Sequence, residues 1–324
     1  MTKKIKPCIK LGFKASITFL GSVFLFALLL KNSSLASTEV SHALGVCANM
    51  LIPALFPLTV ASEILTNTGA IEKLTNKISF PISKILGVSK NATVPYFLGL
   101  FGGYTSSCKS AVLLYQSGKI SKNDCESIIA MSNMPSFAFM TGFIGLGIFC
   151  DSTIGWILWS ITILSTLALG VINNFFFNKS IPIYKCDNIK PKQTRGFSRI
   201  VVDAIAHSTH AMIIICACVV FFSVLIAVLK LYLNEIPISE QTKNIILGTL
   251  EITNGISSCS IIENVSTRAL ACAFLVGWSG LCVHFQVIAL CEDTDISFKK
   301  YFIFKALQGV ICTLLSLIIF SFKF

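Results

Sequence analysis

Long apolar runs separated by short polar segments fill most of this 324-residue chain. Charge-free runs cover residues 40–62, 127–150, 152–178, 204–229 and 269–291. A bilayer core takes about 20 apolar residues per helix, so each of these runs is long enough to span it. Two shorter apolar runs, at 15–30 and 306–322, bring the expected number of transmembrane helices to about seven. The pattern therefore predicts an all-α polytopic membrane protein, in agreement with a mean hydropathy of +0.78.

Two Gly-rich polar stretches interrupt this apolar background. They read LGLFGGYTSSCKS at 98–110 and LGTLEITNGISSCS at 247–260. Irregular backbone at membrane depth is tolerated only where it is buried in protein or lines a watery cavity. Two such interruptions at corresponding places in two halves are typical of the substrate site of a transporter.

The net charge of +11 indicates membrane orientation rather than nucleic-acid binding. Five segments are expected to share one side: the N-terminal segment, the segment after the second span, the segment after the first polar stretch with Lys119 and Lys122, the loop at 178–199 and the start of the last helix. That side then holds 20 of the 26 Lys and Arg residues. Cytoplasmic loops carry such an excess of basic residues. This placement assigns Lys299, Lys300 and Lys305 to the cytoplasmic side.

The number of crossings then predicts that both polar stretches are re-entrant hairpins, one entering from each side. The expected divisions are a basic segment with the first helix (1–39), a first repeat (40–177), a basic cytoplasmic loop (178–199) and a second repeat (200–324). The repeats are expected to have inverted topology, as in many alternating-access carriers.

The polar stretches offer groups that suit a small anionic ligand. Glycines allow close backbone approach, and the hydroxyls of Thr105, Ser106 and Ser107 are donors. Lys109 is costly at depth unless an acid or an anionic ligand pairs with it, although it could instead snorkel to the surface. Glu251 could take a coupling proton, hold Na⁺, pair with Lys109 or lie at a hairpin mouth. The candidate substrate-binding residues are Gly102, Gly103, Tyr104, Thr105, Ser106, Ser107, Lys109, Asn133, Glu251, Thr253, Asn254, Gly255 and His284.

Two of these candidates have an alternative role in helix packing. Asn133, beside the helix-breaking Pro135, could contact ligand or bond to a neighbouring helix. His284 could relay a proton, although an interhelical hydrogen bond is the more common role. Gly277 and Gly280 are expected to let helices approach closely.

The motifs LEITNG at 250–255 and GWSGLCVHFQV at 277–287 resemble the YlbJ-type sporulation integral membrane proteins. The resemblance covers about residues 40–322. It implies a nucleoside-recognition, or Gate, domain, which also occurs in concentrative nucleoside transporters and ferrous-iron transporters. The usual Gly-Tyr-Pro-x-Gly-x-Lys is altered at 103–109, where Thr105 replaces Pro and Ser107 replaces the second Gly, so the chain is a divergent member. The resemblance implies a bacterial cell or forespore membrane and movement of dipicolinate during endospore formation.

Three functions remain open on the sequence. The first is a permease or secondary carrier for a small polar, anionic organic solute, without enzymatic activity. The second is a membrane assembly factor that does not transport, and the third is a metal-dependent hydrolase using Asp203, His207 and His210. No cofactor is expected beyond a coupling Na⁺ or H⁺. The expected partners are the solute and membrane lipid but not nucleic acid, and a homo-oligomer stays open.

Overall fold

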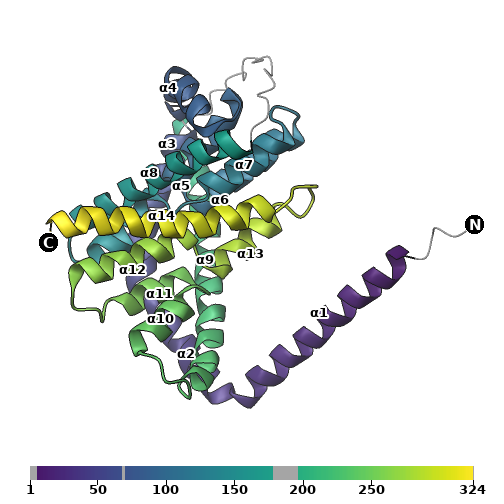
Figure 1. Cartoon of the computed structure of the whole chain (residues 1–324), viewed down its shortest axis with the longest axis vertical. Helices are drawn as coiled ribbons and strands as arrows, with labels where there is room; N and C mark the ends of the chain where they lie inside the picture. Colours follow the sequence, from purple (N-terminus) through teal and green to yellow (C-terminus); the bar gives the residue numbers. More distant parts are fainter. Residues whose placement is uncertain (1–5, 68–69, 178–195, 324) are drawn as a thin grey trace, which may run out of the picture.

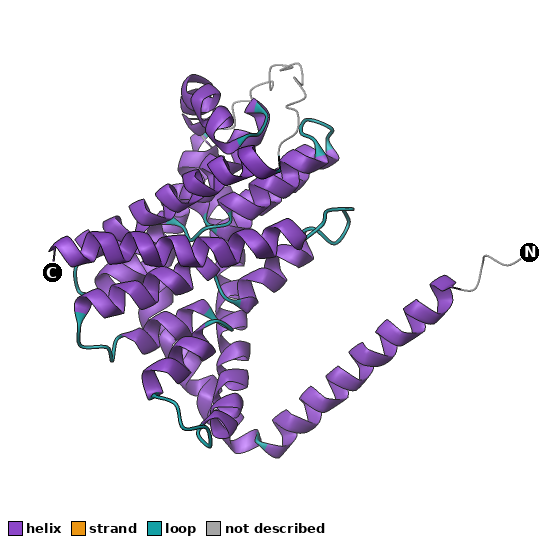
Figure 2. Ribbon diagram, viewed as in Figure 1, coloured by secondary structure: helices purple, strands orange, loops and turns teal. Residues whose placement is uncertain are grey.

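The computed structural model describes residues 6–67, 70–177 and 196–323. Every regular element among these residues is a helix, and Figure 2 shows only helices joined by short loops. This follows from the apolar sequence, because a chain in lipid must pair its backbone groups internally. The prediction of an all-α membrane fold is confirmed.

The first half contains helices before and after the first polar stretch. They are α1 (Lys6–Lys31), α2 (Ser33–Val46), the π-helix η1 (Cys47–Leu51), α3 (Ile52–Asn67), α4 (Ala70–Leu86), the 3₁₀-helix η2 (Lys90–Ala92), α5 (Thr93–Gly102), α6 (Tyr104–Gln116), α7 (Lys122–Ser132), the π-helix η3 (Phe139–Ile148) and α8 (Ser152–Phe176).

The second half begins with the longest helix of the described chain. Its helices are α9 (Phe197–Leu233), α10 (Glu240–Gly248), α11 (Ile252–Cys259), α12 (Val265–Trp278), α13 (Leu281–Leu290) and α14 (Lys299–Lys323). Of the basic loop expected at 178–199, residues 178–195 lie outside the described part. Arg199 lies in the first turn of α9, so the helix begins before the predicted end of that loop.

Five helical stretches in the described part are long and apolar enough to cross a membrane. They are Ser33–Ala61, Ser152–Phe176, Phe197–Leu233, Val265–Leu290 and Lys299–Ser321, and Phe19–Lys31 and Phe139–Ile148 are shorter apolar helices. The span expected at 127–149 is divided after Ser132, where Asn133 and Pro135 predict a break. The span expected at 268–290 is also divided, between α12 and α13. Seven spans with two re-entrant hairpins stays a prediction.

Apart from α4 and η2, which lie between α3 and α5 of the first half, the same order of elements occurs in both halves. A long helix is followed by a helical hairpin, then by a helix with a break near its middle, then by a continuous helix. In the first half these are α2–α3, α5–α6, α7–η3 and α8. In the second half they are α9, α10–α11, α12–α13 and α14.

Helix α14 lies across the middle of the molecule in Figure 1, whereas α1 projects away from the other helices. Helix α14 packs against α12 of its own half and against α7 and α8 of the first half. The second arm of each hairpin contacts the broken helix of the other half, α6 with α13 and α11 with η3. The two halves therefore contact each other at their helix breaks, and also where α9 packs against α2 and α3.

Candidate functional site

Four interruptions of the helices lie within the packed body of the protein. They are Gly103 between α5 and α6, residues 133–136 between α7 and η3, residues 249–251 between α10 and α11, and residues 279–280 between α12 and α13. Gly103, Ser279 and Gly280 have φ values of +79°, +81° and +80°. Gly103 and Gly280 suit this backbone because they lack a Cβ.

In each half, the break of the hairpin packs on the break of the following helix. A Cβ on Gly103 would lie 3.2 Å from the backbone nitrogen of Ser136. A Cβ on Gly280 would lie 2.9 Å from the backbone nitrogen of Ile252. The N–H groups of Leu281 and Cys282 donate to the carbonyls of Thr249 and Leu250, each at 2.9 Å. Gly280 therefore belongs to a break, whereas Gly277 lies against Gln308 as a helix-packing glycine.

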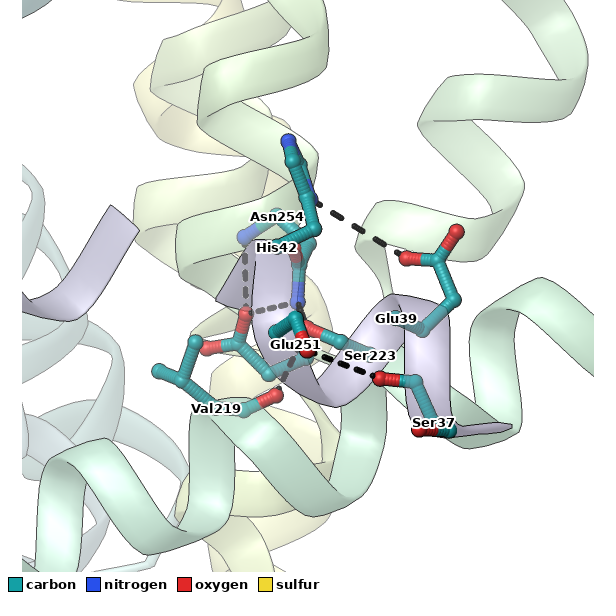
Figure 3. Close-up of polar contacts among 8 residues, drawn as sticks. Ser37, Glu39, His42, Val219, Ser223, Glu251 and Asn254 are labelled. Carbon is teal, nitrogen blue, oxygen red and sulfur yellow. Dashed lines mark hydrogen bonds and ion pairs between the residues drawn. The ribbon is translucent and has the colours of Figure 1, made fainter. Parts of the chain in front are cut away.

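Glu251 caps the second arm of the second hairpin (Figure 3). Its carboxylate accepts hydrogen bonds from the backbone nitrogens of Thr253 at 2.9 Å and Asn254 at 2.7 Å. The Asn254 side chain donates to Glu251 and also to Ser223 of α9. Negative charge is stabilised at a helix N-terminus, so the buried carboxylate has a structural partner. Glu251 is 2% exposed and therefore does not lie at a hairpin mouth.

The other residues of the second hairpin set its shape. Thr253 is buried, and Gly255 packs against Gly248 of the opposite arm, where an added Cβ would lie 2.5 Å from the Gly248 Cα. The two arms thus approach closely because both contact positions lack a side chain.

Two hydroxyls of the first hairpin are already used in hydrogen bonds within the protein. Ser106 donates to the carbonyl of Gly102 at 3.0 Å. Ser107 is fully buried and its hydroxyl bonds to that of Ser132 in α7. Thr105 and Tyr104 are half-buried, and the Tyr104 hydroxyl lies beside Ser279 of the other half. The first hairpin therefore contacts the breaks of both halves.

The structure does not place Lys109 among these buried residues. Its side chain is exposed on α6, although its neighbours Ser107 and Cys108 are buried. The expectation that Lys109 supplies a buried cation is therefore corrected. Its position fits the alternative that a lysine near a helix surface extends away from the protein interior.

The buried cation at the breaks is Lys305 of α14. It is 0% exposed, and its ammonium group donates to the Asn133 carbonyl at 2.7 Å and to Gln308 Oε1 at 2.6 Å. The Tyr104 ring centroid lies 6.0 Å from Lys305 Nζ. Among the described residues, no carboxylate lies within 4 Å of this ammonium group. Lys305 is therefore buried in the bundle rather than exposed at a surface, and the side of the membrane to which it belongs stays a prediction.

Two further candidates belong to the same network. Asn133 Nδ2 donates to the Tyr301 hydroxyl at 3.0 Å, and that hydroxyl lies 2.8 Å from His284 Nδ1. Asn133 is 1% exposed and His284 is 0% exposed. Asn133 Oδ1 and His284 Nε2 are buried without a hydrogen-bond partner. Both residues therefore make an interhelical bond and keep one free polar atom.

Sequence reasoning did not identify Tyr301, Lys305 and Gln308 as site residues. They lie at i, i+4 and i+7, so they share one face of α14. Gln308 also donates to Ser165 of α8 at 3.3 Å, which extends the network to a further helix. This polar spacing within an apolar helix was the available signal.

The hydrolase alternative depends on a metal cluster near the start of α9. His207 and His210 are exposed. Among the described residues, no group of three or more His, Cys, Asp or Glu side chains is placed to hold a metal ion.

The fold and its buried breaks define a multi-pass integral membrane protein. The chain is similar to the "Sporulation integral membrane protein YlbJ" of Bacillus subtilis (strain 168), with 24% identity. The alignment covers 92% of this chain and 81% of YlbJ. The resemblance to YlbJ-type proteins that the sequence motifs indicate is therefore confirmed, and the low identity agrees with a divergent member. No protein-family profile and no solved structure matches the chain.

Proposed function

We propose that this protein is a membrane permease for a small anionic organic solute and acts in endospore formation. The observation that carries the proposal is the environment of Lys305. Its ammonium group is fully buried, and the two bonds that hold it come from neutral acceptors. A buried charge is retained at a high cost unless it is paired, and charged residues within membrane proteins mark substrate or ion pathways.

Among the described residues Lys305 has hydrogen-bond partners but no counter-charge, and an anionic group of a solute would supply one. A carboxylate would form a charge-assisted hydrogen bond with the ammonium group, which is stronger than a bond to a neutral carbonyl. The free atoms Asn133 Oδ1 and His284 Nε2 lie in the same network and offer further contacts. The proposed solute site therefore lies among the breaks, with Lys305 in place of Lys109.

The arrangement of the breaks supports transport rather than simple binding. Carriers commonly place their substrate site between discontinuous helices of two repeats. Here the elements of the two halves follow the same order, and Lys305 of one half bonds to the break of the other. We further propose the finer topology of seven spans and two re-entrant hairpins in inverted repeats.

Dipicolinate is the first solute to test, because the resemblance to YlbJ-type proteins implies it. It carries two carboxylates, and either one could pair with Lys305. A coupling Na⁺ or H⁺ forms part of the proposal. Glu251 is an unfavourable position for that ion, since its oxygens are already used by the N-terminus of α11.

A membrane assembly factor is the second candidate. The observation that favours it is that both hydrogen bonds of Lys305 remain within the protein, so the network can hold the two halves together without a ligand. The altered motif around Thr105 and Ser107 also favours this candidate.

Uptake into liposomes separates the two candidates. The purified full-length protein is reconstituted, and entry of labelled dipicolinate is compared with that into protein-free liposomes. Saturable entry that unlabelled dipicolinate inhibits supports the permease. If neither dipicolinate nor other small dicarboxylates enter faster than into protein-free liposomes, the assembly factor is the better account.

A further inference from the structure

The C-terminal half of α4 presents two different faces. Ser79, Ser83 and Leu86 are buried and follow one another at i, i+4 and i+7, so they share the face that packs on the protein. Phe80 and Lys84 lie one turn apart on another face and are exposed. This part of the helix therefore has one side that the described residues do not cover.

Helix α8 holds this part of α4 in place. Asn173 Nδ2 donates to the carbonyl of Leu86 at 2.8 Å, and Asn174 Nδ2 donates to that of Lys84 at 3.1 Å. Leu86 lies directly over Gly170, where an added Cβ would be 2.7 Å from the leucine side chain. These contacts fix the backbone that carries the exposed side chains of α4.

Two lysines meet at one exposed ring on the exposed face of α4. Lys84 Nζ lies 4.4 Å from the centroid of the Phe80 ring, and Lys90 Nζ lies 5.2 Å from it. Lys90 reaches this position because the chain turns after α4 at Gly87, which has a φ of +64°. Phe80 is 52% exposed, so the ring and both ammonium groups are accessible from outside.

The charges of this cluster have no counter-charge in the described part of the chain. No carboxylate lies within 4 Å of Lys84 or Lys90 there. A ring face attracts a cation only weakly at an exposed position. Two ammonium groups directed at one ring repel each other, so an anion between them is favoured.

The apolar neighbours identify the kind of anion. Ile78 and Ile85 are 38% and 37% exposed on the same segment. A surface helix that exposes apolar side chains beside lysines lies at the boundary between lipid headgroups and acyl chains. At that boundary the anions are phosphates of anionic phospholipids, which attract basic residues.

We propose that Phe80, Lys84 and Lys90 form a binding site for the phosphate headgroup of an anionic phospholipid. The two ammonium groups contact the phosphate oxygens and the ring contacts the glycerol region, while the isoleucines, further round the exposed side of α4, contact neighbouring acyl chains. Helix α4 also contacts α5, the first arm of the first hairpin. A bound lipid therefore helps to fix the position at which that hairpin begins.

Native mass spectrometry of the full-length protein tests the site. The protein is exchanged into mixed micelles containing equal amounts of phosphatidylglycerol and phosphatidylcholine with the same acyl chains. We expect wild-type protein to retain phosphatidylglycerol in preference, and K84Q/K90Q to lose this preference. K84R/K90R should keep it, because the charge remains, and F80A should weaken it.

A variant with the same charge loss elsewhere is the control. K31Q/K230Q removes two lysines at the ends of α1 and α9 and should bind phosphatidylglycerol as the wild type does. Elution of each variant as a single species by size exclusion shows that it is folded. The proposal is overturned if wild-type protein shows no preference between the lipids, or if folded K84Q/K90Q retains phosphatidylglycerol unchanged. The readout does not depend on transport, so it stands apart from the proposed permease function.

Discussion

The ammonium group of Lys305 donates a hydrogen bond to the main-chain carbonyl of Asn133, 2.7 Å away, across 172 residues of sequence. The carbonyl is available because α7 ends at Ser132 and the backbone leaves the helical conformation at Asn133. The C-terminal end of a helix carries partial negative charge, which favours a cation there. In the proposed permease, a solute anion competes for this ammonium group and thereby changes the contact between the two halves.

The break at Gly280 should tolerate no side chain. Gly280→Ala introduces a Cβ 2.9 Å from the backbone nitrogen of Ile252 at a φ of +80°. Such backbone strain alone costs about 1–3 kcal/mol, and the contact adds to it. We expect a clear fall in thermal stability of the detergent-solubilised protein.

Gly45→Ala is the matched control, since an added Cβ at Gly45 in α2 meets nothing within 4 Å. Replacing a helical glycine by alanine should leave stability unchanged or raise it by about 0.5–1 kcal/mol. Equal melting temperatures for Gly280→Ala and wild type would show that the α12–α13 break is not as described.

Oxidation should join the first hairpin to the end of α13. Cys108 Sγ of α6 lies 3.6 Å from Cys291 Sγ, so the two thiols are in direct contact. With a copper(II) phenanthroline oxidant, the two thiols release two protons and two electrons and form a disulfide. We expect non-reducing peptide mapping to find the Cys108–Cys291 link and uptake by the permease to stop.

The Cys108→Ser variant, treated identically, should keep its uptake. If the disulfide forms completely and wild-type uptake continues, α6 and α13 do not need to separate during transport, and the proposed movement between the halves is wrong.

The turn before α14 should loosen in acid. Asp295 accepts hydrogen bonds from Lys122 at 2.9 Å and from Tyr115 at 2.7 Å. These bonds, chiefly the one from Lys122, lower the pKa of the Asp295 carboxyl below its usual value. Because the pKa of this carboxyl is lower in the folded protein than in the unfolded chain, the interaction stabilises the fold fully at pH values above the unfolded-state pKa. This stabilisation is lost as the pH falls through the folded-state pKa. The protection factor of the turn, which is the exchange rate relative to the intrinsic rate at the same pH, should therefore be high near neutral pH and fall below about pH 4.

Asp295→Asn should show the faster exchange already at neutral pH, because an amide does not pair with the Lys122 charge. Asp293→Asn, two residues away on an exposed side chain, is the control and should exchange as the wild type does. A turn that exchanges equally fast in the wild type and in Asp295→Asn would show that this contact does not hold it.

Local composition predicted three of the four breaks. The Gly-rich stretches mark Gly103 and the hairpin at Glu251, and Pro135 marks the break after Ser132, because glycine and proline act on the backbone directly. The sequence predicts a helix-packing role for Gly280, because GWSGL inside an apolar run fits either a close helix contact or a helix break. Only the contact with Ile252 of the second hairpin, in the same half, distinguishes them.

The positions of the lysines could not be predicted in the same way. Lys109 lies in a polar stretch, and Lys305 lies near the start of α14, which begins with Lys299 and Lys300. The local pattern therefore predicts a buried site for Lys109 and an exposed position for Lys305, whereas the structure buries Lys305 and exposes Lys109. Burial of a long side chain depends on which helices cover it. For Lys305 these are the break of α7 and the face of α14 that also carries Gln308.

The central claim is that Lys305 is the counter-charge of an anionic solute, and uptake by Lys305→Met tests it most directly. Methionine keeps much of the length and removes the charge, while Lys109→Met makes the same change on the exposed surface of α6. Loss of the Lys305 donor leaves two buried acceptors unpaired at about 1–3 kcal/mol, so equal amounts of folded protein are compared. We predict that Lys109→Met takes up labelled dipicolinate like the wild type, that Lys305→Met does not, and that Lys305→Arg recovers part of the uptake. Normal uptake by Lys305→Met at equal protein level would contradict the account.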